Sequence, residues 1–432
     1  MKKAENPSPA HRGAQFRQAA GLLGLIIRHS EKPADKHMET YFRQQKAMGV
    51  RDRGFVAETV YGCLRRRRFL EYLAGENASS DTLVAVYLLA IQGWSARALT
   101  EVGFAGDANG LAARTRTLDK TTLPLAVRTD LPDWLLERLL AQLGESETVA
   151  LADALNQPAP LDLRVNTLKA DRDAVAQRLA GEGFPAEPTP WSPVGLRRRE
   201  RLPLFTSAAF KEGLFEVQDE GSQLLGLLLE PRRREMVADF CAGAGGKTLH
   251  LGALMANSGT LYAFDIAQKR LEELKPRLKR AGLDTVRAVA IGHERDTRVQ
   301  RLYGKIDRVL VDAPCSGTGT LRRNPDIKWR TLNLADITAT QQRILTAAAA
   351  LVKPGGRLVY ATCSLLREEN EDIVGDFLAR HPEFQVLPAQ EILARRHIQI
   401  PGAWAADGAL RLYPHRHGTD GFYAIALEKA AP

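Results

Sequence analysis

The chain has 432 residues, of which 44% are hydrophobic, and it carries a formal net charge of +9 at pH 7. This length and composition predict a globular protein of two or three domains, and the moderate basic excess permits a polyanionic partner without requiring one. The four cysteines are too few for a disulfide framework and form no CxxC pair of the zinc type, so we expect reduced thiols, a cytoplasmic protein and no metal.

Helical periodicity dominates the first part of the chain. Apolar residues recur at helical spacing from Arg12 to about Gln142 and strand signals are sparse, which predicts an all-helical domain over residues 1–145. The run Arg65–Arg68 ends one predicted helix, either as a solvated end that complements the helix dipole or as a patch that contacts phosphates. The apolar run Leu22–Ile27 is too short for a signal peptide or a membrane span, so we expect neither.

A small α+β module is expected over residues 146–230. Leu161–Asn166 alternates as a strand does, Asp171–Leu179 has a helical pattern, and Leu214–Gly221 has the pattern of a strand that runs into a helix. The cluster Arg197–Arg201 adds positive charge to this module.

Residues 231–432 alternate between strand and helix patterns. The candidate strands are Met236–Cys241, Thr260–Asp265, Val286–Ile291, Asp307–Asp312, Gly356–Thr362 and Phe422–Leu427, and the candidate helices are Thr248–Ala256, Ala267–Ala281 and Thr338–Val352. Repeated strand–helix units predict an α/β domain with a parallel, doubly wound sheet. Ligands of such sheets bind just beyond the carboxyl ends of the strands, so the loops that follow the strands are where chemistry is expected.

The loop after the first of these strands, Cys241–Lys247, is rich in glycine, which lets a backbone approach a ligand closely. A P-loop would need glycine where Cys241 stands, and a dinucleotide fingerprint would need glycine where Thr248 stands, so both are disfavoured. Asp265 ends the second strand, where an acid can bind ribose hydroxyls. These features predict a nucleoside that has no pyrophosphate. S-adenosylmethionine fits, and its cationic sulfur would tolerate nearby carboxylates.

Two of the four cysteines stand where a predicted strand ends. Cys315 follows Asp312 by three residues, Cys363 directly follows Gly356–Thr362, and a serine comes after each thiol. A single cysteine in such a place is ordinarily a small buried hydrophobic residue. A pair of them at two strand ends predicts a chemical role.

Several stretches together resemble the RsmB/Nop/Sun family of RNA cytosine-5 methyltransferases. They are Asp239–Thr248, Asp265, Asp312–Gly319 and Thr362–Ser364, with the upstream motifs Leu163–Lys169 and Val217–Gly221. This resemblance extends from about Trp134 to the C-terminus. The stretch Arg51–Tyr61 is in turn similar to the NusB-like RNA-binding domain of the RsmB branch.

The resemblance implies a Rossmann-like class I methyltransferase sheet with S-adenosylmethionine as the methyl donor, and it implies Cys363 as nucleophile and Cys315 as second thiol. The implied cofactor contacts are Cys241, Ala242, Gly243, Ala244, Gly245, Gly246, Lys247, Asp265, His293 and Asp312. The sequence departs from the family pattern twice. Ala244 stands where the loop usually has proline. His293 stands where an acid usually faces the adenine, with Glu294 and Asp296 as candidate substitutes.

The implied reaction explains why these residue types are needed. Carbon 5 of cytosine is a poor nucleophile, but addition of a thiolate at carbon 6 makes it an enamine-like carbon that can attack a methyl group. Lys247 would either favour the Cys363 thiolate or fix its own loop. Asp312 would donate a proton to N3, which requires a carboxyl held protonated, as dry pockets can do. Cys315 would assist release of the product, and Asn324–Asp326 is a candidate support for the site.

The expected partner is RNA, with small-subunit ribosomal RNA as the family-level substrate and a monomeric enzyme. The target base must be exposed to reach such a pocket. The helical domain and the cluster Arg197–Arg201 would hold the RNA backbone. Two alternatives stay open: a non-catalytic RNA-binding assembly factor that retains the fold, and an NTPase, which the missing first glycine of the P-loop disfavours.

Overall fold

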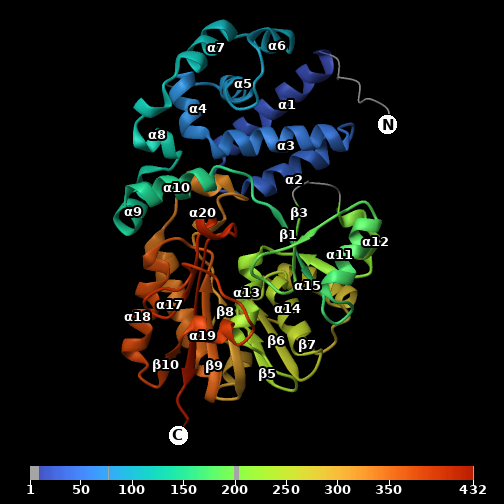
Figure 1. Ribbon diagram of the computed structural model, residues 1–432, viewed down its shortest axis with the longest axis vertical. Helices are drawn as coiled ribbons and strands as arrows, with labels where there is room; N and C mark the ends of the chain where they lie inside the picture. Colours follow the sequence, from blue (N-terminus) through green and yellow to red (C-terminus); the bar gives the residue numbers. More distant parts are fainter. Residues whose placement is uncertain (1–8, 76, 199–203, 432) are drawn as a thin grey trace. The chain divides into compact units, whose positions relative to one another are not determined.

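The computed structural model describes residues 9–75, 77–198 and 204–431. The chain divides into two compact units, one made of residues 1–158 and 320–332 and the other of residues 159–319 and 333–432. Figure 1 follows the chain from the first helix, in blue, to the C-terminal end, in red. None of the helices in the described ranges has both the length and the apolar character that a membrane crossing needs.

The first unit is helical, as the periodicity predicts. Its α-helices are α1 (Pro9–Arg28), α2 (Ala34–Gln44), α3 (Val50–Arg65), α4 (Arg67–Ala74), α5 (Ser80–Ala90), α6 (Ala96–Glu101), α7 (Ala108–Thr117), α8 (Leu125–Thr129), α9 (Asp133–Leu143) and α10 (Glu145–Leu155). Short 3-10 turns lie at η1 (Lys120–Thr122) and η4 (Pro325–Trp329).

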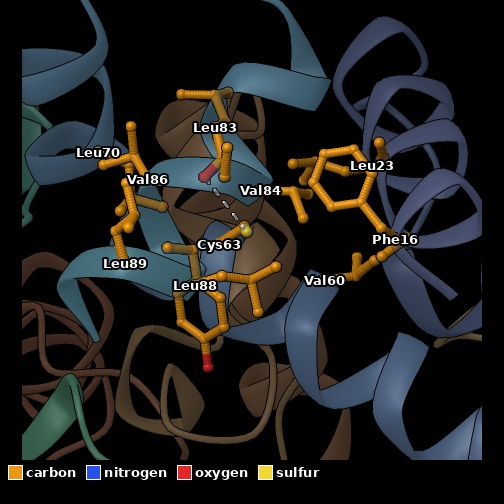
Figure 2. Packing of buried hydrophobic residues seen from close by; sticks show 14 of the residues in the cluster. Phe16, Leu23, Val60, Cys63, Leu70, Leu83, Val84, Val86, Leu88 and Leu89 are labelled. Atoms are coloured by element: carbon orange, nitrogen blue, oxygen red, sulfur yellow. Dashed lines mark hydrogen bonds between the residues drawn. The ribbon is translucent and has the colours of Figure 1, made fainter. Parts of the chain in front are cut away.

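The core of the helical unit forms where α1, α3 and α5 meet. Figure 2 shows Cys63 of α3 among aliphatic side chains of these helices, with its thiol directed at the carbonyl of Leu83 at 4.0 Å. Burial raises the pKa of this thiol well above its usual value, so Cys63 is a core residue rather than a reactive one. The preceding residue is Gly62, where a Cβ would lie 2.2 Å from the ring of Tyr87 in α5. Glycine therefore permits the close packing of α3 on α5.

Residues 320–332 belong to the helical unit, although they directly follow the loop after β8 in sequence. The Lys328 side chain is 1% exposed and donates to the carbonyl of Arg65 at 3.0 Å and to Oδ1 of Asn156 at 2.8 Å. Trp329 donates its indole N–H to a backbone carbonyl of α3 at 2.7 Å. These bonds anchor the segment on α3 and α10.

The stretch Asn324–Asp326 makes its described side-chain contacts inside the same unit. Asp326 accepts the backbone N–H of Ala34 at 3.0 Å, at the start of α2, and pairs with Arg330. Its contacts thus anchor residues 320–332, in place of the support for the thiol site that the sequence suggested.

The arginine run Arg65–Arg68 has a different role from either of those considered from the sequence. Arg65 is 6% exposed and donates to the carbonyl of Arg322 at 3.0 Å. Arg66 pairs with the fully buried Asp130 at 2.6 Å, and the guanidinium groups of Arg67 and Arg68 pair with carboxylates at 2.7 and 2.8 Å. These side chains hold the helical unit together instead of forming a freely solvated helix end.

The second unit begins with the expected α+β module. Its four strands form an antiparallel sheet in the order β2-β3-β1-β4, with β1 (Leu161–Val165), β2 (Glu187–Pro188), β3 (Gly195–Arg198) and β4 (Phe215–Val217). The helices of this part are α11 (Arg172–Gly181), α12 (Ala208–Lys211) and α13 (Glu220–Leu229), with a 3-10 turn at η2 (Leu204–Thr206).

The basic cluster Arg197–Arg201 lies partly outside the described residues, which end at 198 and resume at 204. Arg197 forms two hydrogen bonds to the carboxylate of Asp162, at 2.7 and 2.9 Å. Arg198 is 2% exposed. The two described members of the cluster are therefore committed to the fold, and they do not form the RNA-holding patch expected from the sequence.

The main sheet has the strand order β10-β12-β9-β8-β5-β6-β7, and β11 pairs with β12. Its strands are β5 (Met236–Asp239), β6 (Thr260–Asp265), β7 (Val286–Ala290), β8 (Ile306–Asp312), β9 (Val352–Thr362), β10 (Phe384–Leu387), β11 (Leu410–Leu412) and β12 (Phe422–Lys429). The intervening helices are α14 (Gly246–Leu254), α15 (Gln268–Ala281), α16 (Thr297–Gln300), α17 (Leu334–Leu351), α18 (Glu371–Arg380), α19 (Ala389–Ala394) and α20 (Pro414–His417), with 3-10 turns at η3 (Thr318–Thr320) and η5 (Arg367–Glu369).

The side chains of β8 alternate between two hydrophobic layers. Val309 and Val311 belong to the cluster that contains α17 and α18, whereas Leu310 belongs to the cluster that contains α13 and α19. This alternation follows from the two-residue period of a strand and explains why the middle of β8, Val309–Val311, is apolar on both faces. The chain first runs outward through β5, β6 and β7 and then places β8 on the other side of β5, so the strand order reverses between β5 and β8. Ligands bind at such a point.

The five central strands, β5 to β9, are parallel, as predicted. The last strand, β12, instead pairs antiparallel with β9, and β10 pairs antiparallel with β12. The sequence did not reveal this edge, because β10 and β11 are only four and three residues long. Runs this short carry almost no periodicity.

Candidate functional site

The predicted site residues gather at the carboxyl ends of four neighbouring strands. Asp239 ends β5, Asp265 ends β6, Asp312 ends β8, and Cys363 directly follows β9. The backbone pairing continues past the strand ends, since the N–H of Ala313 donates to the carbonyl of Ala361 at 2.8 Å. The loops that leave these strands therefore start from fixed positions.

Two glycines shape the loop Cys241–Lys247. Gly243 has φ +55° and Gly245 has φ +84°, both in the left-handed region that other residues avoid. A Cβ on Gly245 would also lie 2.1 Å from Leu274. The N–H of Gly243 donates to Asp265 at 2.7 Å, so the loop and the end of β6 are joined. The same carboxylate accepts the N–H of Ala267 at 2.7 Å through its other oxygen.

Two arginines hold this loop from outside. Arg277 of α15 donates to the carbonyl of Ala244 at 2.5 Å, so the loop is fixed at the residue that replaces the usual proline. Arg164 of β1 donates to the carbonyl of Gly246 at 2.6 Å and is 2% exposed. Burial lowers the pKa of Arg164 to about 9. The upstream motif Leu163–Lys169 is thus structural support for the cofactor loop.

Three carboxylates surround the loop. Asp239 is fully buried, accepts the hydroxyl of Thr248 at 2.7 Å, and has a second oxygen without a hydrogen-bond partner among the described residues. Burial raises the pKa of Asp239 to about 7, and the nearby charges of Asp312 and Asp265 act in the same direction. A cationic ligand would relieve this crowding, which fits the sulfonium and ammonium groups of S-adenosylmethionine.

Lys247 forms an ion pair with Asp312, with 2.7 Å between Nζ and Oδ2. Burial lowers the pKa of Lys247, but Asp312 raises it by more, through its charge and its hydrogen bond, so the net shift is upward. The negative charge of a Cys363 thiolate would act in the same direction. The lysine therefore lies within electrostatic range of Cys363, and its ion pair connects the loop Cys241–Lys247 to the end of β8.

The two thiols of Cys315 and Cys363 lie 3.4 Å apart, and both cysteines are free. The loop after β8 is held against the end of β9, because the N–H of Gly319 donates to the carbonyl of Cys363 at 2.8 Å. A Cβ on Gly319 would lie 2.2 Å from the carbonyl of Gly421, so only glycine fits there. The contact with Cys363 and burial together raise the pKa of Cys315 well above its usual value.

The segment expected to face the adenine is more exposed. His293 is exposed, and its ring accepts the N–H of Arg295 at 3.1 Å. Of its candidate substitutes, Glu294 pairs with Arg343 at 3.3 Å, and Asp296 accepts the N–H of Gly292 at 3.0 Å. Hydrogen bonds to Arg298 hold the pKa of Asp296 well below its usual range.

Two residues were missed from the sequence. Ile266 follows Asp265 directly and is 73% exposed, which is unusual for a large apolar residue beside a carboxylate at a strand end. Its position after the acid could have identified it. Glu369 is buried between the loops that carry the two thiols. No local pattern marks a glutamate as a shared acceptor, because its partners come from distant parts of the chain.

Comparisons with known proteins identify the family of this chain. The family model described as 16S rRNA methyltransferase RsmB/F matches residues 226–428, and the ferredoxin-like domain of RsmF/B-like methyltransferases matches residues 131–204. A curated relative from Synechocystis sp., named probable ribosomal RNA small subunit methyltransferase B, is 33% identical and aligns over 96% of this chain and 99% of its own.

Two solved structures are also similar to this chain over most of its length. The crystal structure of PH0851 is 29% identical with a TM-score of 0.78, and the alignment covers 99% of this chain and 100% of that one. A methyltransferase homolog protein from Pyrococcus horikoshii is 31% identical with a TM-score of 0.62, over 72% of this chain and 100% of its own. The chain therefore belongs to the RsmB/F family of methyltransferases, with S-adenosylmethionine as its methyl donor.

Proposed function

We propose that this protein transfers a methyl group from S-adenosylmethionine to carbon 5 of a cytosine in RNA, through a covalent adduct with Cys363. The observation that carries the proposal is the pair of thiols, Cys315 and Cys363, 3.4 Å apart beside the ion pair of Lys247 and Asp312. A methyltransferase that acted on an already nucleophilic atom would need neither thiol. The name of the Synechocystis relative supports small-subunit ribosomal RNA as the substrate.

The residues around the cofactor loop suit the methyl donor. Asp265 would accept the ribose hydroxyls with the lone pairs left free by its two backbone bonds. The exposed side chain of Ile266 offers an apolar surface to the adenine. The unpartnered oxygen of Asp239 would accept from the ammonium of the methionine moiety. When bound, this cofactor supplies a methyl group on a positively charged sulfur, which leaves as a neutral thioether.

The thiols would act in sequence on the base. The thiolate of Cys363 forms a bond to carbon 6, and the electron pair displaced from the ring makes carbon 5 nucleophilic. A proton delivered at N3 from the pair of Lys247 and Asp312 balances the charge, and this proton returns to the pair when the adduct breaks. Carbon 5 then takes the methyl group and loses its proton to a base. Cys315 is our candidate for this base, because it can ionise once the thiolate of Cys363 has been consumed in the adduct and no longer raises its pKa. The bond between Cys363 and carbon 6 breaks last and returns the thiolate.

We expect the helical unit to bind the RNA backbone and the enzyme to act as a monomer. The sequence-based assignment of this unit as NusB-like and RNA-binding supports the first point. The structural engagement of Arg65–Arg68 means that other basic residues would have to contact the phosphates, such as the exposed Arg51, Arg114 and Arg116.

The test is a trap of the covalent adduct. Cys315→Ala should accumulate a denaturant-resistant complex when incubated with S-adenosylmethionine and ribosomal RNA, because release of the product is slowed. Cys363→Ala should form no complex and transfer no methyl group. Cys63→Ala is the matched control, since that thiol lies in the core of the helical unit, and it should behave as the wild type. If no variant traps RNA and the wild type transfers no methyl group, the proposal fails and a non-catalytic RNA-binding assembly factor takes its place.

A further inference from the structure

Glu369 is a fully buried carboxylate that the mechanism above does not use. Oε1 accepts the backbone N–H of Ser316 at 2.8 Å and the amide of Gln341 at 3.0 Å. Oε2 accepts the hydroxyls of Ser316 and Ser364. Within the described chain, all of these donors are neutral. An ionised carboxylate accepts only, so the arrangement suits the charged form of Glu369.

These donors flank the two thiols. Ser316 directly follows Cys315. Gln341 also donates to the carbonyl of Pro314, which directly precedes Cys315, at 2.9 Å. Ser364 directly follows Cys363. One side chain is therefore bonded to both loops within one residue of each sulfur, and the sulfurs themselves lie 3.4 Å apart.

We propose that Glu369 is a positioning residue that sets the separation of the two thiols and keeps Cys315 protonated while Cys363 ionises. This inference rests on the proposed function for its catalytic meaning, but the thiol geometry it describes can be measured without any reaction.

The charges around the two thiols differ in a way that supports this assignment. The pKa of Cys315 is raised by its contact with Cys363 and by burial, and the charge of Glu369 adds to the rise. Lys247 lies instead within electrostatic range of Cys363, beside its partner Asp312. A carboxylate near one sulfur and an ammonium near the other would separate a neutral thiol from a thiolate.

The first readout is the titration of each thiol in the full chain, without RNA or cofactor. The rate of alkylation by iodoacetamide is followed from pH 7 to 10 by mass spectrometry of the peptides that carry each cysteine. Glu369→Gln removes the charge with little change of volume, so Cys315 should titrate at lower pH. Its alkylation at pH 8 should rise about threefold to tenfold, since one pKa unit is a tenfold change in thiolate. Glu383→Gln, an exposed matched control, should change neither thiol.

The second readout is the distance between the sulfurs. Phenylarsine oxide bridges two thiols only when both reach one arsenic atom, and the wild type should bind one equivalent. Ser364→Ala removes one hydrogen bond to Glu369 but keeps the charge. It should weaken this capture roughly fivefold or more, without moving the titration of Cys315. Glu369→Gln should weaken the capture as well.

Each outcome has a defined meaning. Cys63 is 2% exposed, so its alkylation reports global unfolding. If Glu369→Gln unfolds the chain, the effect of Ser364→Ala on arsenic capture decides whether Glu369 positions the thiols. The inference would be overturned if alkylation of Cys315 and Cys363 became faster by the same factor while the pH at which Cys315 titrates stayed the same, because this would show a general loosening of the site. It would also be overturned if both variants captured phenylarsine oxide as tightly as the wild type. If the thiol readouts respond as expected but the wild type transfers no methyl group, the proposed function fails while the positioning role stands. If the wild type methylates cytosine and Glu369→Gln lowers neither kcat nor arsenic capture, the inference alone fails.

Discussion

Two buried lysines, one in each unit, show how the partner decides what burial does to a charge. Lys247 in the catalytic unit has Asp312 at 2.7 Å, and its pKa is raised despite burial. Lys328 in the helical unit donates to a carbonyl and an amide oxygen, and burial lowers its pKa to about 7. Asp130 opposes that lowering, while the charges of Arg65 and Arg66 add to it.

The difference separates an ion for which we propose a role in the reaction from a structural one. A lysine paired with a carboxylate at a strand end keeps its proton and can stabilise charge that develops during a reaction. A lysine whose hydrogen bonds go to a carbonyl and an amide oxygen loses its proton more easily, and its hydrogen bonds serve to anchor residues 320–332. Three substitutions test this contrast, from the largest expected effect to the smallest.

Lys247→Met should cause the largest loss. It removes the ammonium near the nucleophile and leaves Asp312 without its partner, so kcat for methyl transfer should fall about 10²-fold to 10³-fold. Lys353→Met is the matched control, because Lys353 pairs with Asp307 in a more exposed place in the same unit. The control should keep kcat within about twofold of the wild type, given the small worth of exposed ion pairs. Similar losses in both variants would show that the effect is not specific to the site.

Lys328→Met should change how stability depends on pH. Between about pH 7 and 10.4, the unfolded chain holds a proton on this lysine that the folded unit does not, so the free energy of unfolding rises with pH in this window. Burying the charged lysine lowers the free energy of unfolding by its full amount below pH 7, and this loss disappears above the pKa of the lysine in the unfolded chain. It amounts to roughly 5 kcal/mol at most. The methionine variant should lack this rise.

The measurement compares the two chains at each pH. Urea titrations are followed by alkylation of Cys63, which reports opening of the helical unit, and the difference between wild type and Lys328→Met cancels the titration of other groups. A difference that stays constant from pH 7 to 10 would show that Lys328 is charged in the folded unit, as Lys247 is.

Asn156→Asp should have the smallest effect on stability and sharpen the contrast most. It gives Lys328 a carboxylate at the position of the amide oxygen, 2.8 Å from Nζ, and so imitates the pair of Lys247 and Asp312. The amide N–H that Asn156 donates to Thr129 at 3.0 Å is lost, which offsets part of the gain. Stability at pH 7 should change by about 1 kcal/mol or less, while the rise between pH 7 and 10 should flatten. A slope equal to that of the wild type would contradict the comparison.

The parts of this protein that could be predicted are those encoded locally. The five parallel strands, the glycine loop and the acids at the strand ends follow from periodicity and from the position of each residue relative to its own strand. Cys315 and Cys363 could be paired in advance because they follow neighbouring strands of the sheet, and the structure brings their sulfurs together.

The parts that could not be predicted depend on partners far apart in sequence. Lys328 and Arg65, which share a hydrogen bond, are 263 residues apart, and Ser316 lies 53 residues from Glu369. The sequence predicts contact of the arginine run with solvent or phosphate, because the partners of Arg65 and Arg66 lie 257 and 64 residues away. A buried polar group forms a hydrogen bond with the partner that the folded chain brings next to it, and a single sequence does not identify that partner.

The helical unit consists of two separate stretches of the chain, and this affects how it forms during synthesis. Its first 158 residues leave the ribosome long before residues 320–332 that complete it. At synthesis rates of about 5–20 residues per second, the interval is roughly 10–30 seconds. During that time the carbonyl of Arg65 and the amide of Asn156 lack their lysine. The nascent helical unit therefore stays incomplete until residues 320–332 have been synthesised, which happens only after the loop that carries Cys315. For the same reason, a truncation after residue 158 would not isolate a finished domain.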